Sequence, residues 1–306
     1  ILSLARSQGQ ALLPLPNAVL VLRSASRPES ALTARSIASY CGCRPLFILD
    51  EKNALPGLGP ICRAKNLMPV FNYSCGPGEM VHIPDIKGYQ GALLVTAGLE
   101  GAFESSHGNL SSWIIPRPTL EERKLLWDAH LGDGRLSERL ARDHVHSTAR
   151  IVELAKLARR QSTSHNRSRV DMDDIREAAW LTESSGLSAL AQPLNAVVKD
   201  DALIVRPFTG KQLALLEKRC HIRESLGESL GVTIKARYQM GVKALFLGPS
   251  GTGKTLAASW LANRLGIPLY RVDLAAITSK YIGETEKNLA QLLGQAEQEE
   301  VVLLFD

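Results

Sequence analysis

Short apolar runs alternate with mixed, helix-like stretches over the first part of the chain, up to about residue 115. The runs are continuous, which is typical of strands that both faces of a parallel sheet bury. A helix is predicted between the first two runs, at Ala31–Tyr40. Residues 1–115 therefore predict an α/β core. Its expected strands are Ala18–Leu22, Pro45–Leu49, Leu67–Phe71, Gly91–Thr96 and Ser112–Ile115.

The pattern changes at Pro116, and from there to about residue 184 the apolar positions follow helical periodicity. Thr119 and Glu122 have the spacing of a capping box, so a helix is expected to begin there. Residues 116–190 thus predict a small all-helical unit. Further helices are expected at Leu136–Arg142, Thr148–Arg160 and Asp171–Thr182, with a polar loop at Gln161–Arg169.

The α/β pattern then begins again. Residues 191–240 are interpreted as a linker with a long amphipathic helix at about Gly210–Leu226, and residues 241–306 as the start of a second core. A whole architecture that recurs indicates an internal repeat. The expected strands are Ala244–Leu247, Leu269–Val272 and Val301–Phe305, and the expected helices are Lys254–Leu265 and Glu284–Gln298.

The composition excludes several classes of protein but does not indicate a function. The chain has 306 residues, which suggests about two domains. With 45% hydrophobic and 22% charged residues it is unlike collagen-like, coiled-coil or disordered chains. No apolar run approaches the ~20 residues of a membrane-spanning helix, so no membrane partner is expected. The net charge of +5 weakly favours an anionic partner, but the basic residues are scattered.

The cysteines do not indicate a disulfide framework or a zinc site, because their number is odd and their spacing irregular. We expect reduced thiols in a cytoplasmic protein. A redox role for Cys41 and Cys43 is the alternative to two small residues buried at a helix end. The five cysteines are Cys41, Cys43, Cys62, Cys75 and Cys220.

The two ends suggest a segment of a longer protein. The chain starts at Ile1 without a methionine or a signal segment, and it stops at Asp306 directly after an apolar run. We expect this segment alone to be poorly stable and inactive, because an interrupted second α/β core leaves open sheet edges and apolar faces.

Residues 248–255 read GPSGTGKT and fit the phosphate-loop pattern G-x-x-x-x-G-K-[ST] between a predicted strand and a predicted helix. Glycines allow positive φ, so successive backbone N–H groups can point at phosphate oxygens, and the helix N-terminus adds a positive dipole end. Lys254 would reach the β- and γ-phosphates of a nucleotide, and Thr255 would ligate Mg²⁺. The alternative is a glycine-rich turn with an incidental lysine and threonine.

Asp306 follows the apolar run Val301–Phe305, which places a carboxylate at the C-terminal tip of a buried strand. Open parallel sheets hold their ligands at this edge. We therefore expect Asp306 to hold Mg²⁺ directly or through water, in partnership with the loop. On its own the strand could simply end in an aspartate.

These stretches resemble the AAA+ ATPases, and within them the tandem-ring unfoldases and remodelling motors. The most specific stretch is SKYIGETEKN at 279–288, which looks like that group's pore loop 1, with Tyr281, Ile282 and Gly283 facing the channel of a hexameric ring. The alternative is that Tyr281 packs against its own sheet. The resemblance implies catalytic roles for Lys254 and Asp306, and nucleotide contacts from Gly248, Pro249, Ser250, Gly251, Thr252, Gly253, Lys254, Thr255 and Leu256.

The first core resembles the same module without its chemistry. At the position of its phosphate loop residues 23–30 read RSASRPES, without glycine or a Lys-Thr pair, and Glu29 would repel phosphate. The strand at 67–71 runs into Asn72 and Tyr73 rather than paired carboxylates. No arginine lies between residue 96 and Pro116 to serve a neighbouring subunit. The resemblance thus implies a non-hydrolysing core at 1–115 and its helical lid at 116–190.

The first function hypothesis is an ATP- and Mg²⁺-dependent ring motor, a hydrolase that remodels or unfolds a protein client. The second is a nucleic-acid-associated ATPase such as a loader or initiator, which only the positive charge supports. The third is a scaffold that binds ATP with little turnover. An acidic residue after Asp306 would favour turnover, and an apolar one would favour the scaffold.

Overall fold

The computed structural model describes most of the chain in two compact units. Unit 1 comprises Ile1–Thr119 with Ser147–Arg150, and unit 2 comprises Leu120–His146 with Ile151–Asp306. Within them the described residues are 2–12, 15–48, 56–106, 109–181, 187, 191–194, 198, 200–229, 241–274 and 284–305.

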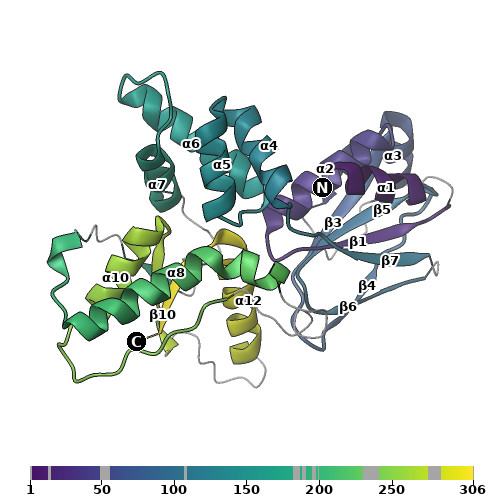
Figure 1. Ribbon diagram of the computed structural model, residues 1–306. Coiled ribbons are helices and arrows are strands. Elements are labelled where there is room, and N and C mark those ends of the chain that lie inside the picture. The colour runs from purple at the N-terminus through teal and green to yellow at the C-terminus, as the bar shows by residue number, and fades with distance from the viewer. Residues whose placement is uncertain are drawn as a thin grey trace. The chain divides into compact units, whose positions relative to one another are not determined.

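Unit 1 is built on a five-stranded parallel sheet with the strand order β2-β3-β5-β1-β7 (Figure 1). The fourth of these strands along the chain, β5, therefore lies between the first and the third. The strands are β1 (Val19–Arg23), β2 (Arg44–Ile48), β3 (Leu67–Tyr73), β5 (Leu93–Ala97) and β7 (Leu110–Ile114).

Alternate residues of β1 face two different apolar clusters. Leu20 and Leu22 pack in the cluster that α1 (Leu2–Leu12) and α2 (Arg27–Tyr40) complete. Val19 and Val21 pack in the cluster on the opposite face, which α3 and the parallel pair β4–β6 complete. Both faces of the sheet are covered, which explains the continuous apolar runs. The covering elements of the second face are α3 (Leu58–Lys65), β4 (Met80–Ile83) and β6 (Ala102–Ser105).

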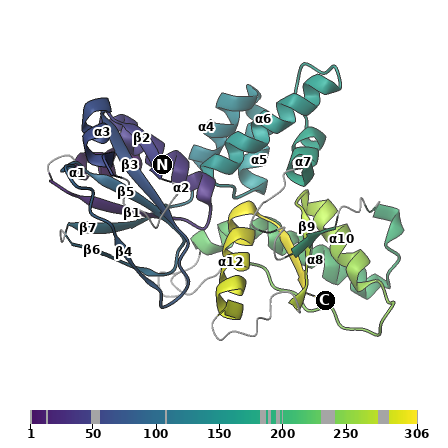
Figure 2. The same cartoon turned by 180° about the vertical axis from the view of Figure 1, so that it is seen from behind.

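Unit 2 begins with four helices around one apolar cluster (Figure 2). Trp127 and Leu140 from the first two helices meet Ile151 and Leu154 of the third and Ile175 of the fourth, and all are buried. The helices are α4 (Leu120–Leu131), α5 (Gly134–Asp143), α6 (Thr148–Ser164) and α7 (Met172–Leu181).

The rest of unit 2 is a small α/β part. Strand β9 pairs with β10 in parallel and with β8 in antiparallel orientation. Helix α12 packs on the face of Tyr270 and Val272, and α10 packs on the face of Leu269. The elements are β8 (Ala191–Pro193), the 3-10 turn Asp200–Ala202, α8 (Pro207–Ser229), α10 (Lys254–Leu265), β9 (Leu269–Val272), α12 (Glu284–Glu299) and β10 (Val302–Phe305).

Several predicted bounds need correction. Helix α2 begins at Arg27 rather than Ala31, because Ser26 caps it with its side chain. Helix α6 continues to Ser164, into the stretch expected to be a loop. The hydrophobic pattern does not predict α1, α3, β4, β6 or β8.

The predicted strand Ala244–Leu247 is wrong, since these residues join no described sheet. Leu245 and Leu247 are 80% and 85% exposed, while Phe246 packs against the α10–β9 cluster. A strand needs neighbours for its backbone N–H and C=O groups. In the described sheet β10 is an edge strand and does not pair with residues 244–247, so the apolar run alone does not make a strand.

Among the described helices, none combines the length and the apolar character that crossing a membrane requires.

Candidate functional site

The candidate phosphate site is the loop 248–253, which leads directly into α10. Gly251 and Gly253 have φ of 77° and 82°, in the left-handed region where a Cβ is strained. At Gly248 a Cβ would lie 3.0 Å from the Thr252 hydroxyl oxygen. Gly251 and Gly253 are therefore needed for the shape of this loop, and Gly248 allows the close approach of Thr252.

Lys254 folds back over the loop. Its Nζ donates to the carbonyl oxygens of Gly248 at 3.0 Å and of Pro249 at 2.9 Å. The Thr252 hydroxyl also donates to the Pro249 carbonyl, at 2.8 Å. The loop thus curls around an ammonium group that is held by neutral acceptors. A charged acceptor such as phosphate binds an ammonium more strongly than carbonyls do.

The N-terminus of α10 is open to an anion. Its cap residue Gly253 has no side chain to satisfy the first-turn N–H groups. Most of the loop is exposed, as are Thr255 and Leu256 in the first turn. Open N–H groups, the helix dipole and the Lys254 charge together fit a polyphosphate, and the accessible Thr255 hydroxyl fits a Mg²⁺ ligand.

The remaining predicted site residues lie outside the described part of the chain: Asp306, Tyr281, Ile282 and Gly283. Strand β10 ends at Phe305, directly before Asp306 in the chain. Because β9 and β10 are parallel, their carboxyl ends meet at one edge of the sheet.

The matching position in unit 1 is built from different residues. Residues 24–26 alone connect β1 to α2, and they carry no glycine. Glu29, in the first turn of α2, is only 3% exposed, and its Oε2 accepts the N–H of Ala149 at 2.6 Å. The sequence indicates that Glu29 would repel phosphate, but no local pattern points to this partner 120 positions away.

A buried polar cluster in unit 2 was not predicted either. The Glu300 carboxylate lies 3.2 Å and 3.3 Å from the Nδ1 atoms of His144 and His146, accepts the Val145 N–H, and forms an ion pair with Arg223. Burial lowers the pKa of His144 to about 4, so the ring is neutral. Two imidazoles and a carboxylate at this spacing could hold a metal ion. Here the guanidinium already compensates the carboxylate, so the cluster is a closed internal network.

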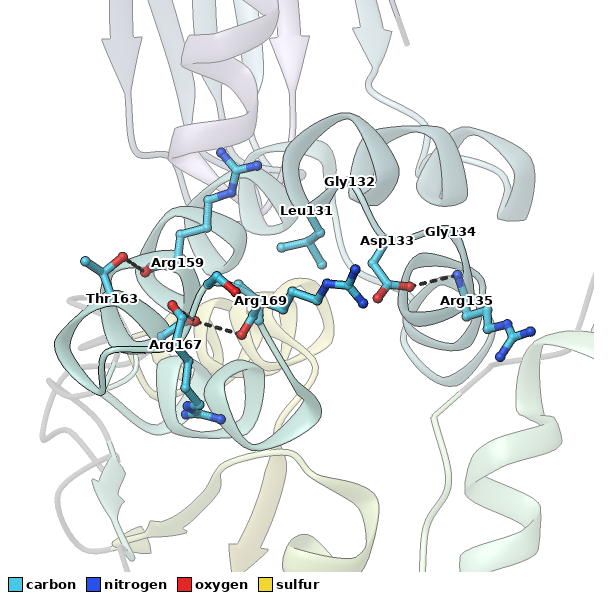
Figure 3. A pocket seen from close by; sticks show the side chains of 12 residues that line it. Leu131, Gly132, Asp133, Gly134, Arg135, Arg159, Thr163, Arg167 and Arg169 are labelled. Carbon is cyan, nitrogen blue, oxygen red and sulfur yellow. Dashed lines mark hydrogen bonds between the residues drawn. The ribbon is translucent and has the colours of Figure 1, made fainter.

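The helical part of unit 2 contains a pocket of about 710 Å³, and four of the residues that line it are arginines. Figure 3 shows this pocket from close by. Arg159 and Arg135 point away from one another, while Arg169 points across the pocket. Arg167 is held by Asp171 and Asp174. The guanidinium groups diverge, so they do not converge on one anion.

All five cysteines are free thiols. Burial raises the pKa of Cys41 and of Cys43, which keeps both in the unreactive thiol form at neutral pH.

A glycine-rich loop at the N-terminus of α10, followed by the parallel strands β9 and β10, fits a core of the P-loop NTPase class in this part of unit 2. Residues 244–306 match the family described as "ATPase family associated with various cellular activities (AAA)". The AAA match thus covers the loop, α10, β9, α12 and β10.

Three relatives illustrate this similarity. An uncharacterized AAA family ATPase, y4kL, of Sinorhizobium fredii is 47% identical over 21% of this chain and 19% of its own length. The 26S proteasome regulatory subunit 10B of Dictyostelium discoideum is 37% identical over 22% of this chain and 18% of its own length. The ATP-dependent zinc metalloprotease FtsH of Methylibium petroleiphilum is 25% identical over 59% of this chain and 33% of its own length. The chain therefore spans a third or less of these relatives.

Proposed function

We propose that the protein binds and hydrolyses ATP at the loop 248–256 and uses the energy to remodel a protein client. The observation that carries the proposal is the Lys254 ammonium inside a loop whose glycines adopt positive φ at an uncapped helix N-terminus. The AAA family match over the same residues supports it. Among the similar proteins are a proteasome subunit and an ATP-dependent protease by name.

Each loop residue has a specific role in this proposal. Lys254 exchanges the carbonyls of Gly248 and Pro249 for the β- and γ-phosphate oxygens, and the loop amides donate to the same phosphates. Thr255 and Asp306 would hold Mg²⁺, which when bound would neutralise negative charge on the phosphates. The protein catalyses in-line attack by water through positioning and charge compensation rather than through a covalent step.

Unit 1, in this proposal, is a second module of the same kind without hydrolytic chemistry. Its five-stranded parallel sheet, with β5 between β1 and β3, is an α/β core such as the resemblance predicts for residues 1–115. Its first loop lacks the glycines and the lysine that unit 2 has. We infer that residues 1–115 form the degenerate core, that 116–190 form its lid, and that 191–240 link it to the ATP-binding core at 241–306.

We further infer that the intact protein assembles into a ring, with Tyr281, Ile282 and Gly283 gripping the client. Tyr281→Ala should then spare nucleotide binding and reduce client remodelling, because the tyrosine contacts the client and not the nucleotide. Steady-state ATPase and substrate-unfolding assays on the same preparation measure the two effects. Equal loss of nucleotide binding would contradict the assignment.

The decisive test of ATP hydrolysis is Lys254→Ala in the intact protein. We expect ATP turnover to fall to background, because no other group on the loop supplies a positive side chain to the phosphates. Lys211→Ala, at an exposed lysine of α8, is the matched control and should leave turnover unchanged. Turnover that persists in Lys254→Ala would overturn the assignment.

A further inference from the structure

Glu29 occupies the third position after the helix cap Ser26, the spacing of a capping box. In a capping box the glutamate bonds back to the N–H of the cap residue. Here the Ser24 hydroxyl accepts the Ser26 N–H at 3.1 Å instead, while the Ser26 hydroxyl accepts the Glu29 N–H at 3.3 Å. The Glu29 carboxylate therefore does not bond to the Ser26 N–H, and it can accept a hydrogen bond from a more distant residue.

It reaches the first turn of α6. Glu29 Oε2 accepts the Ala149 N–H at 2.6 Å, and the Ser147 hydroxyl accepts the next N–H, that of Arg150, at 3.3 Å. Residues 147–150 belong to unit 1 by their contacts, so this bridge lies within one compact unit. The carboxylate thus lies at the N-termini of two helices, α2 and α6, at once.

The electrostatics of this place favour an anion. Helices α2 and α6 have 14 and 17 residues, and each presents the positive end of its dipole. Glu29 is nearly fully buried, and its Oε1 has no hydrogen-bond partner among the described residues. A buried carboxylate with one unbonded oxygen is costly in an apolar site. It persists because the two helix ends and the Ala149 amide compensate its charge.

The loop that precedes α2 is shorter than the loop that precedes α10. Residues 24–26 span the distance from β1 to α2, whereas residues 248–253 precede α10. We propose that the Glu29 carboxylate is a resident oxyanion: it fills, in unit 1, the helix N-terminal position that unit 2 leaves open for phosphate. Unit 1 thereby ties the first turn of α6 to α2 without any nucleotide. These contacts lie in unit 1 and do not depend on ATP hydrolysis in unit 2.

Amide hydrogen exchange at Ala149 tests the proposal. The intact protein carries Lys254→Ala throughout, so that added anions do not act through the loop 248–255. In Glu29→Ala we expect Ala149 to exchange about fivefold faster, the factor typical of a lost helix-cap bond. Acetate or inorganic phosphate, compared with chloride at equal ionic strength, should slow it again. With Glu29 intact, neither anion should change the rate. Glu121→Ala, at an exposed first-turn glutamate of α4, is the control and should not respond.

Three results would overturn the proposal: unchanged Ala149 exchange in Glu29→Ala, no recovery with either anion, or protection by these anions while Glu29 is intact. If Glu29→Ala does not fold, Glu29→Gln decides, because it keeps the shape and an acceptor oxygen but removes the charge. Faster Ala149 exchange in Glu29→Gln that neither anion slows would support the proposal, because the glutamine still fills the site but lacks the charge. Ala149 exchange at the wild-type rate in Glu29→Gln would contradict the proposal.

Discussion

Helices α10 and α2 each begin beside an α/β sheet, yet their N-termini are built in opposite ways. The first follows an exposed loop with two left-handed glycines and a lysine folded onto it. The second follows a short serine loop and carries a buried carboxylate. Both satisfy the same physical need, since unpaired N–H groups at a helix start attract negative charge. In α2 the chain supplies that charge itself, whereas α10 leaves the position accessible to a ligand.

The two buried carboxylates offer a second contrast. Glu29 accepts a backbone amide, while Glu300 lies beside two imidazoles and a guanidinium. Only the Glu300 network contains imidazoles, which in the unfolded chain take up protons near pH 6.5. The two units should therefore respond differently to acid even though each holds a buried glutamate.

The largest expected effect comes from Gly253→Val, which places a β-branched residue at φ 82°. Left-handed strain and the lost approach to phosphate should together weaken ATP binding at least about a hundredfold, or roughly 3 kcal/mol. Isothermal titration with a non-hydrolysable analogue and Mg²⁺ measures it. Gly266→Val carries similar strain at φ 68° beyond the other end of α10 and is the control. If Gly253→Val and Gly266→Val bind the analogue equally well, the positive φ at Gly253 does not determine nucleotide binding.

The second effect is acid destabilisation of unit 2. His144 is neutral when folded, with a pKa lowered by burial to about 4 against 6.5 for a free imidazole. The unfolded chain therefore takes up more protons below pH 6.5, and stability falls as pH drops toward 4. From pH 7 to 5 we expect a loss of about 2 kcal/mol.

Chemical denaturation followed by hydrogen exchange in each unit measures this loss. His144→Gln should remove the pH dependence, and His221→Gln, at an exposed histidine of α8, should not. An equal acid response in unit 1 would contradict the contrast between the two carboxylates.

The smallest effect is expected for Ser26→Ala. It removes the side-chain cap of α2 and should cost unit 1 about 1 kcal/mol. ATP turnover should not change, because α2 lies outside the proposed nucleotide site. Thermal unfolding and a turnover assay on one sample check both statements; a loss of turnover without a loss of stability would place α2 in the active site.

The sequence predicted elements well where the local pattern suffices. Strand β9 and helix α10 have the predicted bounds, because an apolar run and the phosphate-loop spacing each specify them locally. The prediction of a strand at 244–247 is wrong, because a strand needs a neighbouring strand to pair with and apolar side chains alone do not supply one. The bridge from Glu29 to Ala149 and the contacts of Glu300 join residues 120 and 156 positions apart, which no local pattern encodes.

The most direct test of the central contrast is hydrogen exchange in the intact protein with and without a magnesium-bound, non-hydrolysable ATP analogue. We predict that the nucleotide slows amide exchange at residues 248–256 and leaves residues 24–30 unchanged. Slower exchange at 24–30, or no change at 248–256, would contradict the account.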